Sequence, residues 1–179
     1  MHPRTQELLQ HLDDSRLVLR KAVDKVPASL REIRPAVDRW SVAEVLEHLG
    51  VVEAAVTRRI STLLSAARDQ GLGQERDTSS VLATFDLPRV LDRSRAVTTS
   101  EAGRPKQGLS ATAAWAALDD TRAVFRQTVV EADGLALGSI VAPHPALGPM
   151  NLYHWIAFVG GHELRHAAQI REIGTQLCH

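Results

Sequence analysis

The chain has one cysteine among its 179 residues, Cys178, so it cannot form an internal disulfide bond. It also lacks an excess of charge: 21 lysines and arginines balance 21 aspartates and glutamates, with no basic cluster. This balance argues against nucleic acid or an anionic membrane as a partner. No apolar run approaches the roughly 18 residues of a membrane span, and the N-terminus does not resemble a secretory signal. We therefore expect a cytoplasmic protein without membrane association.

The alternation of apolar and polar residues that marks β-strands is nearly absent as well. Apolar residues instead recur at helical spacing, which predicts four long helices at residues 4–26, 41–70, 110–131 and 151–173. Ordered connections are expected at residues 27–39, 72–109 and 142–149, the last rich in proline and glycine and not helical throughout. With 44% hydrophobic residues, the chain is expected to form one all-α domain over residues 1–179, a four-helix bundle.

Several local signals predict where helices begin and end. Ser41 and Glu44 have the spacing of a capping box, in which each side chain bonds the other residue's backbone N–H. Gly174 is placed to end the fourth helix. Within the long connection, Asp86 introduces a candidate short helix, and residues 98–108 are expected to be extended.

Three histidines occupy the apolar faces of two predicted helices. His162 and His166 are four residues apart, so their side chains lie about 40° apart around the helix axis. His48 lies on the apolar face of the second helix. Imidazoles that face a core need a hydrogen-bond partner or a metal, and three of them can hold an ion with one position open. The sequence therefore predicts a metal site at His48, His162 and His166.

The heights of these histidines predict how the two helices run. His48 lies seven residues after the expected start of its helix, and His166 lies seven residues before the expected end of its own. Each is about 10 Å from that helix end. The three side chains come level if the second and fourth helices are antiparallel, and they are offset if the helices are parallel.

The run from His162 to His166 also matches H-E-x-x-H, the zinc metalloprotease motif. Such enzymes draw a third ligand from further along the chain. Only 13 residues follow His166, and their sole histidine is the terminal His179. We therefore reject a protease. Glu163 is left either as a catalytic acid or base or as a solvated helix carboxylate.

Other polar residues near the centre are weaker candidates. His154 lies about 12 Å from His162 along the helix, which suits a pocket wall. Arg165 could contact substrate, although an ion pair with a neighbouring acidic residue is the favoured interpretation. The remaining histidines are expected to be a loop residue (His144) or solvated (His2, His11 and His179).

Three segments of the sequence resemble the DinB/YfiT-like superfamily of metalloenzymes, in particular its DinB-like branch. They are Trp40-Ser41-x-x-Glu44-Val45-Leu46-x-His48-Leu49, His144-Pro145-Ala146-Leu147-Gly148-Pro149-Met150-Asn151-Leu152 and Trp155-Ile156-x-Phe158-x-x-x-His162-x-x-Arg165-His166-x-x-Gln169-Ile170. The resemblance implies a four-helix bundle, often a homodimer, with a divalent metal site carried over to His48, His162 and His166.

The resemblance also implies an activity on a small-molecule substrate. Relatives of this kind include S-transferases that use bacillithiol or mycothiol, and a mycothiol-dependent maleylpyruvate isomerase. We therefore expect a metal-dependent thiol transferase or isomerase, with Glu163, His154 and Arg165 as candidate catalytic residues and a low-molecular-weight thiol as co-substrate. Zinc, nickel and iron all suit imidazole ligands. A non-catalytic metal-binding stress-response bundle is the main alternative, and a metal-dependent hydrolase is a further one.

Overall fold

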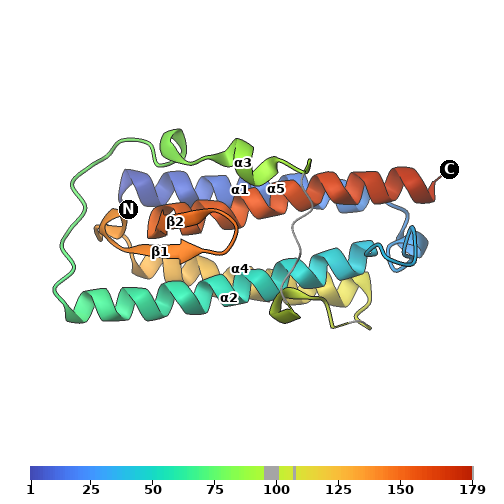
Figure 1. Cartoon of the computed structure of the whole chain (residues 1–179), viewed down its shortest axis with the longest axis horizontal. Helices are drawn as coiled ribbons and strands as arrows, with labels where there is room; N and C mark the ends of the chain where they lie inside the picture. The colour runs from blue at the N-terminus through green and yellow to red at the C-terminus, as the bar shows by residue number, and fades with distance from the viewer. Residues whose placement is uncertain (95–100, 107, 179) are drawn as a thin grey trace.

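Four long helices dominate the computed structural model, which describes residues 1–94, 101–106 and 108–178. They are α1 (Pro3–Asp24), α2 (Val42–Asp69), α4 (Ala111–Glu131) and α5 (Leu152–Leu177), and they lie side by side along the long axis of the molecule (Figure 1). The predicted all-α four-helix architecture is confirmed. Across the described residues, no helix is both long and apolar enough to span a membrane.

Side-chain caps define the starts of the helices, as the sequence predicts for α2. Ser41 Oγ accepts a hydrogen bond from the Glu44 amide at 3.2 Å, and a Glu44 carboxylate oxygen accepts one from the Ser41 amide at 2.9 Å. The prediction that Gly174 ends α5 is wrong, because the helix continues to Leu177. A Cβ at Gly174 would lie 3.0 Å from a methyl group of Val26. This glycine therefore lets the end of α1 approach α5 closely.

Helices α2 and α5 run antiparallel, as the heights of the histidines predict. Near the end of α2, Arg59 lies over the ring of Trp155 at the start of α5. Earlier in α2, His48 faces His162, which is further along α5. Since residue numbers rise along one helix as they fall along the other, the two helices run in opposite directions.

The other two close pairs, α1 with α5 and α2 with α4, are parallel. Their contacts include His11–Ala157 and Val26–Gly174 in the first pair, and Glu53–Arg122 and Arg68–Glu131 in the second. Because α2 and α4 run the same way, the chain between them must return along the whole bundle. This crossover carries α3 (Leu87–Leu91), which packs on α5 (Figure 1).

The connections contain short elements that the sequence predicts only in part. The short helix expected at Asp86 is present as α3, with the Asp86 side chain as its cap. Of the segment 98–108, expected to be extended, residues 98–100 and 107 lie outside the described residues, and η3 (Glu101–Gly103) is a 3-10 turn. The remaining 3-10 turns are η1 (Ala28–Leu30), η2 (Leu82–Thr84) and η4 (Leu137–Ser139).

A small β-hairpin precedes α5, where the sequence shows only a turn-rich connection. Its antiparallel strands are β1 (Val141–His144) and β2 (Gly148–Asn151), with His144 paired to Gly148. Four-residue strands are too short to give a recognisable alternation. Gly148 has a φ of +82°, a conformation that glycine adopts without strain, and it starts the return strand.

The apolar core has two parts, separated by a layer of buried charge. Each long helix contributes one residue to this layer, which we call the charged quartet: Arg16, Glu53, Arg122 and Glu163. The Arg122 guanidinium contacts Glu53 at 2.6 Å and Glu163 at 3.0 Å, and Arg16 contacts Glu163 at 2.8 Å. Two positive and two negative charges therefore meet at the middle of the bundle and link all four helices.

Candidate metal centre

His48 lies two turns into α2, and its side chain is buried, with 4% of its surface exposed. Its Nδ1 is 2.6 Å from the carbonyl oxygen of Gly103, in the crossover. Because a carbonyl oxygen can only accept a hydrogen bond, Nδ1 carries the ring proton. The lone pair of the neutral ring is therefore on Nε2, which faces α5.

The Nε2 atoms of the three predicted ligands converge between α2 and α5. The Nε2 of His162 is 3.3 Å from that of His48 and 3.1 Å from that of His166. One ligand atom from each of the three residues lies within 4.8 Å of the others. Two nitrogens bound to one tetrahedral ion at about 2.0–2.1 Å are themselves roughly 3.3–3.4 Å apart. The observed spacing thus fits a common divalent ion, and the donor set can hold one.

Neighbouring groups hold the three rings in place. Nδ1 of His166 lies 2.7 Å from the side-chain oxygen of Gln169, one turn further along α5, which leaves Nε2 of His166 as the acceptor. The ring of His162 stacks on that of Phe158, with ring centres 5.3 Å apart and planes 23° apart. Trp40 covers His48 at a ring distance of 5.0 Å. Such hydrogen bonds and packing orient imidazoles for metal binding.

Burial keeps these imidazoles neutral. It lowers the pKa of His48, lowers that of His162 well below its ordinary value, and lowers that of His166 to about 3, with the neighbouring histidines adding to the effect at His162 and His166. Metal ligands must be deprotonated, so this environment favours the ligand form across the neutral range. Three neutral lone pairs that point together repel one another unless a cation or a shared proton lies between them.

Glu163 is not one of the groups that converge here, and its role as a catalytic acid or base stays a prediction. Its carboxylate is on the other side of α5, is 1% exposed, and pairs with Arg16 and Arg122 in the charged quartet. The interpretation as a solvated carboxylate is therefore wrong. A residue that follows a ligand in a helix is turned about 100° away from it. What separates this chain from an H-E-x-x-H metalloprotease is the pairing of the Glu163 carboxylate with Arg16 and Arg122, which occupies the group that would serve as the general base.

The side chains of Arg165 and His154 contact the crossover rather than the three histidines. The Arg165 guanidinium donates to the backbone carbonyls of Val90 and Asp92 and so attaches the crossover to α5. Asp92 is thus an acidic neighbour of Arg165, as the sequence predicts, but the contact is a hydrogen bond to its backbone carbonyl. Nε2 of His154 is 3.1 Å from the Thr84 hydroxyl, again in the crossover. His154 is two turns before His162, as its place in the sequence requires, and its role as a pocket wall stays a prediction.

Two other histidines differ from their predicted roles. His11, expected to be solvated, is 9% exposed, and its Nε2 donates to the carbonyl of Ala157 at 3.0 Å. His144, expected in a loop, ends β1 and packs against Phe158 with ring centres 4.5 Å apart. His2 is half-buried and caps α1, and His179 lies outside the described residues. The helical period of α1 could have placed His11 in the core, since it falls next to Leu8 and Leu12 on the apolar face.

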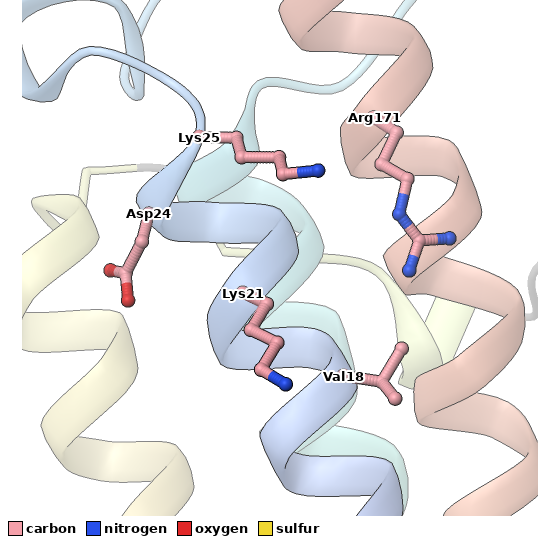
Figure 2. A pocket seen from close by; sticks show the side chains of 5 residues that line it. All are labelled: Val18, Lys21, Asp24, Lys25 and Arg171. Atoms are coloured by element: carbon pink, nitrogen blue, oxygen red, sulfur yellow. The ribbon is translucent and has the colours of Figure 1, made fainter.

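Two surface grooves lie away from the histidines. Between α1 and α5, one groove is lined by Val18, Lys21, Asp24, Lys25 and Arg171. Figure 2 shows the side chains of Lys25 and Arg171 extending toward the space between the helices, with Asp24 turned away. The other groove lies between the start of α2 and residues 108–110. Neither of these two grooves includes a residue of the candidate metal centre.

A comparison with protein families adds an independent finding. The family model of the DinB superfamily matches residues 11–170, which include all three histidines. No curated protein and no solved structure matches the chain.

Proposed function

Because this chain belongs to the DinB superfamily, we propose that it is a metal-dependent enzyme that transfers a low-molecular-weight thiol to an electrophilic substrate or uses it for isomerisation. In this proposal His48, His162 and His166 hold one divalent ion, such as zinc, nickel or iron. The observation that carries it is the convergence of three Nε2 atoms whose rings are oriented by Gly103, Phe158 and Gln169.

The three imidazole donors suit catalysis because they carry no charge and leave one coordination position open. A divalent ion bound by three imidazoles keeps its full charge and lowers the pKa of a thiol or water beside it. Catalytic zinc sites have three protein donors and an open fourth position, and three donors converge here among the described residues, which supports the proposal. Trp40 and Phe158 restrict water around two of the rings, which strengthens electrostatic interactions there.

Metal content is the first test. The purified protein should contain, or take up on dialysis, about one equivalent of zinc, nickel or iron by elemental analysis. His166→Ala should bind less, and His154→Ala, which changes a histidine outside the centre, should bind as much as the wild type. Less than a tenth of an equivalent, with no uptake on addition, would refute the proposed site.

Thiol consumption then tests the reaction. Metal-loaded wild-type protein should consume mycothiol or bacillithiol with an alkylating electrophile faster than apoprotein, and metal-loaded His154→Ala should match it. One other function is a non-catalytic metal-binding bundle, in which the same three imidazoles hold an ion. Stoichiometric metal without metal-dependent turnover of any thiol would support that function and exclude the transferase.

A further inference from the structure

His144 has a ring whose protonation pattern is determined by the backbone around it. It ends β1, and its Nδ1 accepts hydrogen bonds from the amides of Ala146 and Leu147, both at 3.2 Å. A nitrogen that accepts from N–H groups carries no proton of its own. The proton of the neutral ring is therefore on Nε2, which makes this atom a hydrogen-bond donor.

Nε2 of His144 is available to a ligand. Among the described residues, no side chain or backbone group accepts a hydrogen bond from this atom. It is also not among the fully buried polar atoms that have no hydrogen-bond partner. The ring is half-buried. Burial, with the nearby charge of Arg59 adding to it, lowers the pKa of His144 to about 4, so the ring stays neutral in the physiological range.

The His144 ring also lies in a row of aromatic rings that leads to the metal centre. It packs against Trp155 and Phe158, with ring centres 5.0 and 4.5 Å apart. Phe158 in turn stacks on His162. Trp155, Phe158 and His162 follow one another on a single face of α5, since their spacings are three and four residues. His144 is therefore one ring away from a predicted ligand, on the same face of the helix.

The charge around His144 favours an oxygen acceptor. The guanidinium of Arg59 lies over Trp155 and donates to the carbonyl of Pro143, the residue before His144. A fixed N–H donor beside a positive charge is complementary to a carbonyl or carboxylate oxygen. A neutral histidine with a fixed tautomer can polarise a carbonyl in this way.

We propose that His144 is a substrate-binding residue whose Nε2–H donates to a carbonyl or carboxylate oxygen of the electrophile at the three-histidine centre. The assignment rests on the proposed function. It adds a substrate class, electrophiles that carry an oxygen acceptor beside the reactive carbon, and a specificity residue that the ligand set does not contain.

Kinetics with two alkylating agents test this specificity in a Cys178→Ser background, which removes the exposed thiol of the chain. Iodoacetamide has a carbonyl beside its reactive carbon, and 1-iodopropane has none. With either one, the thiolate sulfur forms the C–S bond and iodide leaves with the C–I electron pair. His144→Phe should raise KM for iodoacetamide about five- to tenfold, the effect of one lost hydrogen bond. KM for 1-iodopropane should not change.

Controls separate this role from a structural one. His144→Gln, which has an amide N–H near the position of Nε2, should restore most of the affinity for iodoacetamide. His2→Phe, at a half-buried histidine that caps the start of α1, should affect neither substrate. Metal content should be the same in all variants. An equal loss with both electrophiles, or loss of metal in His144→Phe, would overturn the proposal.

Nitrogen-15 NMR of the full-length apoprotein provides a readout that does not depend on turnover. The His144 signals should show an unprotonated Nδ1 and a protonated Nε2, and addition of pyruvate should shift the Nε2 resonance. A protonated Nδ1, or no shift with pyruvate, would overturn the role of His144. If the wild type consumes no thiol with either electrophile while the NMR result is positive, the proposed reaction fails and the oxygen-binding role of His144 stands.

Discussion

Removal of Arg122 from the charged quartet should destabilise the bundle strongly. This guanidinium contacts Glu53 at 2.6 Å, Glu163 at 3.0 Å and the carbonyl of Leu12 at 3.1 Å, and all of these groups are buried. Arg122→Met keeps an apolar stem of similar length but leaves two buried carboxylates with Arg16 as the remaining cation of the quartet. Breaking a buried ion pair in this way costs about 3–5 kcal/mol. That is a large part of the roughly 5–15 kcal/mol by which domains are stable.

Urea denaturation of the metal-free protein at several pH values measures this effect. Burial raises the pKa of Glu163 from its usual 4.5, although Arg122 and Arg16 oppose the shift. Loss of Arg122 should raise it further. A group with a raised pKa in the folded state binds more protons there than in the unfolded state, so its contribution to stability falls as the pH rises through that pKa. The stability that the variant loses relative to the wild type should therefore shrink as the pH falls from neutral toward 4.5, and the histidines, common to both proteins, cancel in this difference.

Arg126→Met is the matched control, one turn further along α4. Its partner is Asp13, and both side chains are more than a third exposed, so the loss should be below about 1 kcal/mol. A loss below about 1 kcal/mol for Arg122→Met as well would refute the argument from buried charge. So would a stability difference between variant and wild type that grows as the pH falls over the same range.

Three further predictions concern the packing and chemistry of α5. Gly160→Ala should destabilise the fold by about 1–3 kcal/mol in thermal unfolding, because its Cβ would lie 2.5 Å from Nε2 of His11; Gly73→Ala, where a Cβ has no neighbour within 4 Å, should have little effect beyond any local backbone change. Gln169→Leu should weaken metal affinity tenfold or more in equilibrium dialysis, since the ring of His166 loses its orienting partner; unchanged affinity would contradict that role. The pKa of His166 falls from 6.5 to about 3 on folding, so the apoprotein should lose stability as the pH falls from about 6.5 toward 3; constant stability over this range in urea titrations would show that the ring is not buried as a neutral group.

Much of the fold follows from local sequence patterns. The period of apolar residues locates four helices, and the Ser41–Glu44 capping box marks the start of α2 because its hydrogen bonds form within one turn. The end of α5 could not be predicted in this way. Gly174 is a helix terminator by local rules, yet the approach of Val26, two residues after the end of α1, explains why a glycine stands there. The hairpin was missed because its pairing is a contact between two strands, each only four residues long.

The candidate site could likewise be predicted from the sequence only in part. His48, His162 and His166 could be selected from helical faces and heights, and the structure brings them together; metal binding by them stays a prediction. Glu163 could not be placed, because its surroundings depend on Arg16 and Arg122 from two other helices. Gly103 could not be found either, since a backbone carbonyl 55 residues beyond His48 has no side-chain signal.

The sequence by itself determined which residues share a face of each helix, because that property depends only on the 3.6-residue period and the local caps. It also determined that the three histidines come level if α2 and α5 are antiparallel. The tertiary structure decided what each face meets. It buried Glu163 among guanidinium groups, oriented His48 by Gly103, and placed His144 at the end of β1 against Phe158. These outcomes depend on contacts between segments far apart in the chain, and local periodicity contains no information about such contacts.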